Sequence, residues 1–260
     1  MAIFYLHHQI KGRSKGKNIV AAAAYRSGDA LTDEKTKRRY DYSRKAGVLH
    51  AEIGAPKQAT PWASIRAELW NRLEFVEDRS TRHESAQLAH SFELALPHEM
   101  TLGQQVFLMR DFVRETFTRK GFVADWAIHA PHRNGNGKNF HAHILVPLRP
   151  IEGRGFAKRK PRTFGQQSEI IRTWRQRWAR LTNRHLARYG IEARIDERAK
   201  VNQLPKPSRP SSFLGVNGGR SPPCERPWLA VPKGADNHGH GSLLPFTTKS
   251  GQDYRLHFEL

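Results

Sequence analysis

The chain has 260 residues, 38% of them hydrophobic, which is enough for one sizeable core. Its 44 Lys and Arg against 24 Asp and Glu give a formal net charge of +20, which favours a polyanionic partner, nucleic acid before an anionic membrane surface. The single Cys224 excludes an internal disulfide and a cysteine zinc cluster. With no apolar run near the roughly 20 residues of a spanning helix and no signal-peptide pattern, we expect a cytoplasmic protein without membrane insertion.

The first elements place a tyrosine at the end of a helix. Residues 2–10 predict a strand, and 11–17 a basic Gly/Ser loop. Asn18 is a good N-cap for a helix that passes through four alanines and stops at Gly28. Tyr25 lies near the end of this helix and is followed by Arg26. The phenol is either a packing residue or an exposed group near a phosphate.

The stretch 32–48 is charged and rich in turns. Arg38 and Arg39 precede Tyr40 and Tyr42, and aromatic rings among basic residues can stack on the bases of single-stranded nucleic acid. A solvated loop with two structural tyrosines fits the same pattern. We therefore take Arg26, Arg38 and Arg39 as candidate phosphate contacts.

The next segments predict a short strand and a core helix. Residues 48–53 favour the strand, and 62–78 favour an amphipathic helix with a core stripe. The stripe consists of Trp62, Ile65, Leu69, Leu73 and Val76. The charged run 77–84 is expected to be exposed.

A strand and a capped helix follow. In 91–97, Phe92, Leu94 and Leu96 share one face, whereas Glu93 lies on the other face. Thr101 is the expected cap of a helix over 102–119. Glu93 is either a solvent-facing residue or part of a site on that second face.

Three histidines are candidates for a metal site. A strand over about 124–131 contains His129, and a strand over about 139–148 contains His141 and His143, with a Gly/Asn-rich loop between them. Residues two apart on a strand point the same way, about 6–7 Å apart. If the strands pair as a hairpin, His129 joins this face, and three imidazoles can bind a metal with open positions for water or a phosphate oxygen. The alternative is three half-exposed polar residues.

The rest of the chain is basic and then low in complexity. Lys158, Arg159, Lys160 and Arg162 lie in a Gly/Pro-broken loop over 147–165 and suit backbone phosphates, although a solvated charge run fits too. Residues 166–189 predict a long helix ending at Gly190, and 191–196 an extended segment. From about Val201, Pro, Gly and Ser dominate. We therefore expect a domain over 1–198 and a flexible tail over 199–260.

Several stretches together resemble one family. They are AIFYLHHQIKGRSKGKNIVAAAAYRSG, SFELALPHEMT, AIHAPH, NFHAHILVP and WRQRWARLTNRHLARYGIEARID. In this order the chain is similar to the relaxase domain of the MobA/MobL family, and especially to its TraA-type conjugative proteins. The resemblance covers about residues 1–198.

The resemblance implies a fold, an activity and roles for single residues. It implies an α+β two-layer sandwich with a central antiparallel sheet and helices mainly on one face. The activity is that of an HUH endonuclease in the bacterial cytoplasm: metal-dependent nicking of single-stranded DNA at an origin of transfer through a 5′-phosphotyrosyl intermediate. It assigns the nucleophile to Tyr25, an acidic role to Glu93 and the divalent metal, Mg²⁺ or Mn²⁺, to His129, His141 and His143.

Alternatives remain at this stage. Glu93 is either a proton acceptor or a group that orients a histidine, and Tyr40 or Tyr42 is a candidate second nucleophile. Relaxosome and coupling proteins are the implied partners, and helicase or primase domains of related proteins have no counterpart in the Pro/Gly-rich tail. The rival functions are a non-catalytic DNA-binding accessory protein with this fold, and a metal hydrolase or oxygenase of small substrates.

Overall fold

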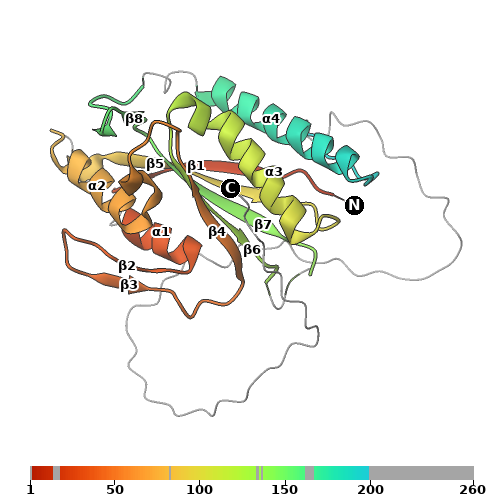
Figure 1. Cartoon of the computed structure of the whole chain (residues 1–260), viewed down its shortest axis with the longest axis horizontal. Coiled ribbons are helices and arrows are strands. Elements are labelled where there is room, and N and C mark those ends of the chain that lie inside the picture. The colour runs from red at the N-terminus through yellow and green to blue at the C-terminus, as the bar shows by residue number, and fades with distance from the viewer. Residues whose placement is uncertain are drawn as a thin grey trace, which may run out of the picture. The chain divides into compact units, whose positions relative to one another are not determined.

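A five-stranded antiparallel sheet forms the centre of the computed structural model (Figure 1). The structure describes residues 2–13, 18–81, 83–132, 135, 137–161 and 167–198. The predicted tail and Arg162 lie outside these residues. The strands, in their order across the sheet, are β1 (Leu6–Gly12), β5 (Gln87–Ala95), β7 (His141–Pro147), β6 (Ala124–His129) and β4 (Val48–Gly54).

Helices pack on both faces of this sheet (Figure 1). The two longest, α3 (Leu102–Thr116) and α4 (Gln167–Arg188), bury their apolar sides against Phe92, Trp126 and Ile144. The other two, α1 (Ile19–Ser27) and α2 (Arg66–Asp78), cover part of the opposite face. The expected α+β fold with a central antiparallel sheet is confirmed, and α1 and α2 extend the helical cover beyond the one face we expected to carry most of it.

Local sequence signals explain where the helices begin and end. The Asn18 side chain accepts a hydrogen bond from the Ala21 amide at 2.9 Å, and Gly28 ends α1 with a φ of 72°, which disfavours other residues. Thr101 and Gln104 form a reciprocal capping box at the start of α3. The sequence predicted all three of these boundary residues, namely Asn18, Gly28 and Thr101.

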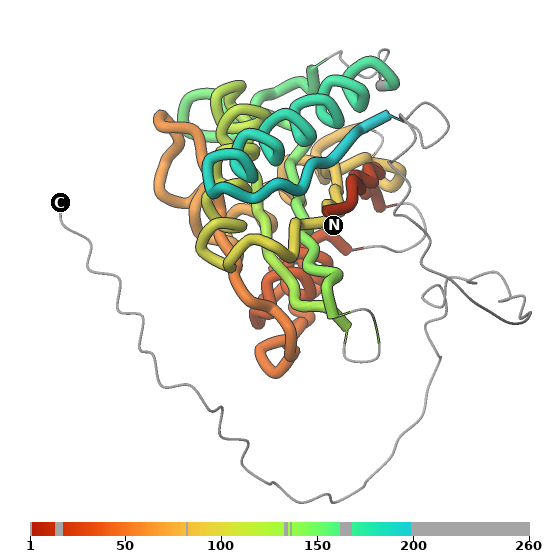
Figure 2. The backbone as a smooth tube through the Cα atoms, turned by 90° about the vertical axis from the view of Figure 1, so that its right-hand side faces the viewer, coloured from red at the N-terminus to blue at the C-terminus, as the bar shows by residue number. Residues whose placement is uncertain are grey.

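Short elements fill the connections. A hairpin of β2 (Ala30–Thr32) and β3 (Arg39–Asp41) lies in the stretch predicted only as turn-rich, and β8 (Ile151–Glu152) pairs with β9 (Gly155–Phe156) in the basic loop. Three 3₁₀ turns occur at Pro61–Ser64, His83–Ser85 and Thr118–Lys120. After α4, residues 191–198 fold back along that helix (Figure 2), where Asn183 exchanges two hydrogen bonds with the backbone of Ile195 at 2.9 Å.

Two expectations for the segment 62–84 are wrong. Ile65 does not belong to the buried stripe: it stands between the 3₁₀ turn and α2 and is 48% exposed. Glu77 is not exposed but 1% accessible, because Arg149 at 2.6 Å and Lys160 at 2.9 Å neutralise its carboxylate inside the protein. A charge run predicts exposure only when no partner from a distant segment reaches it.

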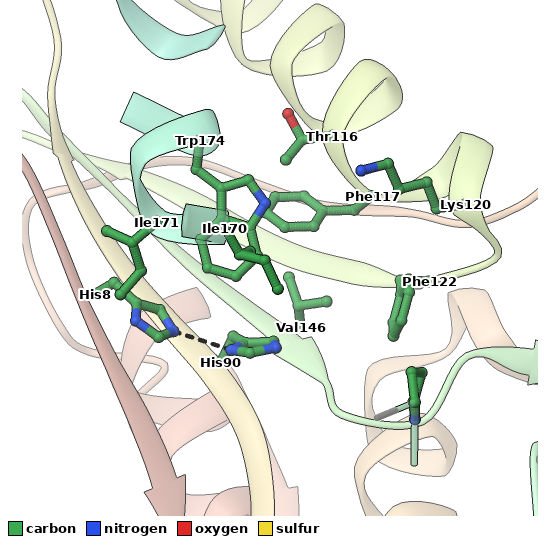
Figure 3. A pocket seen from close by; sticks show the side chains of 11 residues that line it. His8, His90, Thr116, Phe117, Lys120, Phe122, Val146, Ile170, Ile171 and Trp174 are labelled. Carbon is green, nitrogen blue, oxygen red and sulfur yellow. Dashed lines mark hydrogen bonds between the residues drawn. The ribbon is translucent and has the colours of Figure 1, made fainter. Parts of the chain in front are cut away.

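An apolar cavity of about 190 Å³ lies on the α3/α4 face (Figure 3). His8 and His90 line it and are hydrogen-bonded at 2.9 Å, and Trp174 packs edge-on against both rings. Among the described helices, none is long and apolar enough to cross a lipid bilayer.

Candidate metal centre and tyrosine site

Antiparallel pairing of β6 and β7 brings three histidines together. His129 lies opposite His141 in the register, and His143 is two residues further along β7 on the same face. Their ring centroids are 4.8–5.4 Å apart, and one nitrogen from each ring lies within 4.8 Å of the other two. Small rotations of the side chains can direct these three nitrogens at one metal ion, so the residues fit a facial imidazole site.

Backbone carbonyls orient two of the three rings. His129 Nε2 lies 2.7 Å from the Arg26 carbonyl oxygen, and His141 Nδ1 lies 3.0 Å from that of Asn139. With its proton on that nitrogen, each ring donates to a carbonyl and keeps its other nitrogen as a lone-pair donor, an arrangement typical of metal-binding histidines. The first of these hydrogen bonds also ties the end of α1 to the site.

Burial keeps two of the imidazoles neutral. It lowers the pKa of His129 to about 4, with the nearby charge of Lys45 acting in the same direction. Burial also lowers the pKa of His143 to about 2, followed by the charges of Arg26 and the neighbouring imidazoles. Neutral imidazole is the form that binds a metal, so these two histidines need not lose a proton near neutral pH to do so.

The helix turn that carries Tyr25 lies against this face, and the residue is accessible. Tyr25 is 51% exposed and comes from the last turn of α1, one residue before the carbonyl that contacts His129. The Tyr42 ring packs edge-on against it at 5.2 Å, and Lys45 Nζ lies 3.5 Å from its ring centroid. The ring is thus held by its neighbours, while its hydroxyl has no hydrogen-bond partner among the described residues.

A cation and a carboxylate complete the histidine face. Arg26 donates to Ser91 Oγ at 3.0 Å and to the Ala22 carbonyl at 3.2 Å, and its Nε is buried without a partner among the described residues. Burial lowers the pKa of Arg26 to about 10. Glu93 lies directly opposite His143 in the β5–β7 register and is partly buried. Their side chains therefore share a face with Cβ atoms about 5 Å apart.

A buried ion-pair network supports the end of α1 behind the site. Arg66 forms hydrogen bonds with Asp125 on β6 at 2.9–3.0 Å and with Asp29, one residue past the helix cap. Trp70 Nε1 donates to the same Asp125 at 2.8 Å. Asp125 is four residues before His129, so this network fixes the helix that presents Tyr25 to the strand that presents the first histidine.

The candidate phosphate contacts occupy different environments. Arg38, Arg39, Lys158 and Arg159 are exposed. Arg38 lies over the Tyr40 ring at 5.2 Å and Arg39 pairs with Asp41 at 3.3 Å. Lys160, by contrast, is engaged by buried Glu77.

Sequence reasoning missed two residues of the site. Lys45 stands in a run of charged residues, and nothing in that run distinguishes it from its solvated neighbours. Ser91 alternates with Glu93 on the predicted second face of its strand, so the strand period was a usable signal for it.

Fold and site together define an α+β protein with an accessible tyrosine next to a three-histidine centre. The model of the MobA/MobL family matches residues 17–220, and the chain belongs to that family. It is 33% identical over 232 residues to the conjugal transfer protein TraA of Agrobacterium fabrum, covering 78% of this chain and 20% of that protein. It is 34% identical to the mobilization protein MobL of Acidithiobacillus ferridurans, covering 78% and 59%. The chain thus spans about a fifth of the TraA length.

A solved structure is also similar to this chain. It is described as the molecular basis of vancomycin resistance transfer in Staphylococcus aureus and aligns with a TM-score of 0.67 at 27% identity. The alignment covers 76% of this chain and 100% of the other. The likeness extends over the whole of that structure and agrees with the antiparallel sheet and its helices.

Proposed function

We propose that the chain is a DNA relaxase domain that nicks one strand at an origin of transfer for plasmid mobilization or conjugation. One observation carries the proposal. The helix turn that bears Tyr25 meets the histidine face, because His129 Nε2 lies 2.7 Å from the Arg26 carbonyl oxygen. Membership of the MobA/MobL family and the net charge of +20 support the same reading.

The reaction is a transesterification at phosphorus. Tyr25 Oη attacks, the Oη–P bond forms, and the bond from phosphorus to the 3′ oxygen breaks. The products are a 5′-phosphotyrosyl end and a 3′-hydroxyl, which takes up one proton. Glu93 accepts the phenolic proton, since it faces the site and its carboxylate accepts no hydrogen bond from the described residues. A free phenol has a pKa of about 10, so the reaction needs such an acceptor.

His129, His141 and His143 would hold a divalent ion, Mn²⁺ or Mg²⁺. When bound, the ion supplies Lewis-acid polarisation of the phosphate and balances its negative charge. Neutral ligands leave the full charge of the ion available to the substrate. Of the two ions, Mn²⁺ is the better match, because imidazole nitrogen binds first-row transition ions better than oxygen-seeking Mg²⁺.

Adduct formation tests the proposal. The protein is incubated with a pool of single-stranded oligonucleotides of random sequence and Mn²⁺, and covalent complexes are separated on a denaturing gel. Sequencing of the trapped strands gives the cleavage site. We expect a protein–DNA adduct from the wild type, none from Tyr25→Phe, and a strongly reduced amount from His143→Ala or in EDTA.

The rival functions give different results. A non-catalytic accessory protein would bind single-stranded DNA in a salt-sensitive way and form no adduct. An adduct that survives in Tyr25→Phe but disappears in Tyr40→Phe or Tyr42→Phe would move the nucleophile to the β3 region. Binding of partner proteins of the transfer machinery belongs to this proposal as well and is tested separately by co-purification with the DNA-bound protein.

A further inference from the structure

A lysine without an acidic partner lies against the proposed nucleophile. Lys45 Nζ is 3.5 Å from the centroid of the Tyr25 ring and donates a hydrogen bond to the Tyr25 carbonyl oxygen at 2.7 Å. The residue is half-buried, and none of the ion pairs found among the described residues includes it. With one N–H on the carbonyl and the ring on another side, the ammonium keeps at least one N–H group for a further acceptor.

The backbone fixes this ammonium in place. The Lys45 amide donates to the Tyr42 carbonyl at 2.9 Å, and the Tyr42 amide donates to the Asp29 carbonyl at 3.1 Å. The turn 42–45 is thus attached to the residue that follows the cap of α1. Tyr42 makes a T-shaped contact with the Tyr25 ring, and Lys45 lies over the face of that ring. The same turn positions the phenol and the charge.

Positive charge accumulates around the histidine face. Burial, followed by the charge of Arg26, lowers the pKa of Lys45 to about 8. The charge of Lys45 adds to the larger effect of burial in lowering the pKa values of His129 and His143. A partly buried cation beside another cation is unfavourable unless an anion neutralises it. Glu93 is one such carboxylate near Arg26. A second anion is needed for Lys45, and the substrate of the proposed reaction carries one.

We propose that the Lys45 ammonium contacts the scissile phosphodiester while it holds the Tyr25 ring. The inference rests on the proposed relaxase function and adds a substrate-contacting residue to it. Negative charge on the phosphoryl oxygens must be balanced at the moment when Tyr25 Oη approaches phosphorus. An ammonium fixed within 3.5 Å of the attacking ring supplies that charge without reorganisation.

Neutralising the scissile phosphate separates this contact from a structural role. Oligonucleotides containing the cleavage site are made with a normal phosphate or a neutral methylphosphonate at the scissile position. Their affinity is measured at fixed salt and Mn²⁺ for the Tyr25→Phe protein, which keeps the ring and cannot react. The same measurement is made after adding Lys45→Met, Lys45→Gln or Lys45→Arg. The control is Lys57→Met, which removes one exposed charge from the loop before the first 3₁₀ turn.

The expected result is a coupling between the lysine and the phosphate charge. With the normal phosphate, Lys45→Met and Lys45→Gln weaken binding roughly tenfold to a hundredfold, the range of a hydrogen bond to a charged group. With the methylphosphonate, these variants bind about as well as their Tyr25→Phe parent. The effect of losing the lysine thus depends on the negative charge of the scissile phosphate. Lys45→Arg keeps most of the affinity, and Lys57→Met changes both substrates alike.

Four outcomes would overturn the inference. Equal weakening with both oligonucleotides would give Lys45 a structural role only, and unchanged affinity with both would remove the contact. Suppose instead that both uncharged variants fail to fold, as seen in thermal unfolding, while Lys45→Arg folds. In that case, equal affinity of Lys45→Arg for the phosphate and the methylphosphonate would also remove the contact. If the wild type forms no adduct with any strand, the relaxase function itself fails, and this inference fails with it. An adduct without coupling refutes Lys45 alone.

Discussion

Arg66 holds the site in place without belonging to the proposed chemistry, so its replacement tests how much the site depends on its structural support. Its guanidinium is 14% exposed and joins Asp125, 6% exposed, to Asp29 at the end of α1. Replacement by Met removes the cation and leaves the buried Asp125 carboxylate, among the described residues, with only the Trp70 N–H as a side-chain hydrogen-bond partner. Breaking a buried pair in this way costs about 3–5 kcal/mol.

The expected loss of stability is measurable by heat or urea. For a domain of this size, 1 kcal/mol corresponds to a shift of about 2–4 °C, so Arg66→Met should lower Tm by roughly 10 °C. The matched control is Arg72→Met on the same helix, because Arg72 pairs with Glu68 at 3.1 Å with both side chains about half exposed. An exposed pair of this kind contributes less than about 1 kcal/mol.

The charge itself can be tested by a double variant. Asp125→Asn combined with Arg66→Met removes both charges, so it should cost less than the sum of the two single changes. Below its melting temperature, Arg66→Met should also form the DNA adduct more slowly than Arg72→Met, because the turn that bears Tyr25 is less well held. A loss no larger than that of Arg72→Met in both assays would refute the role given to this network.

Three further predictions follow from other parts of the molecule. Burial lowers the pKa of His8 to about 4 and that of His90 to about 3. Below about pH 6.5 the unfolded chain therefore binds more protons than the folded chain, and the free energy of unfolding should fall from there towards pH 3. Urea midpoints measured over this range should fall less steeply in His90→Gln than in the wild type. Mn²⁺ at a hundred times its Kd should stabilise the wild type by about 2.7 kcal/mol, and a thermal shift of the same size in His141→Ala would exclude that ligand. Arg159→Met should weaken binding of single-stranded DNA and reduce the dependence of the affinity on salt by a slope of about 1, without loss of stability. Lys160→Met should instead lower Tm, because it leaves buried Glu77 with one cation. Equal melting temperatures of the two variants would contradict this.

The local pattern of the chain determined much of the fold. Asn18 and Gly28 delimit α1 because a side-chain cap and a left-handed glycine each act on backbone groups only a few residues away along the chain. Strand alternation likewise put Glu93, His141 and His143 on definite faces, since successive side chains on a strand point to opposite sides whatever the sheet order. The resemblance of these stretches to the MobA/MobL family then agreed with the match of the family model.

Only the tertiary structure decided which distant residues meet. The order β1-β5-β7-β6-β4 sets Glu93 beside His143, and the contact of His129 with the Arg26 carbonyl sets the turn of Tyr25 against the histidine face. Burial of Glu77 and the approach of Lys45 to Tyr25 follow from partners more than ten residues away. No local period carries such information, because charge pairing and ring packing depend on distance in space, whereas capping and alternation depend on distance along the chain.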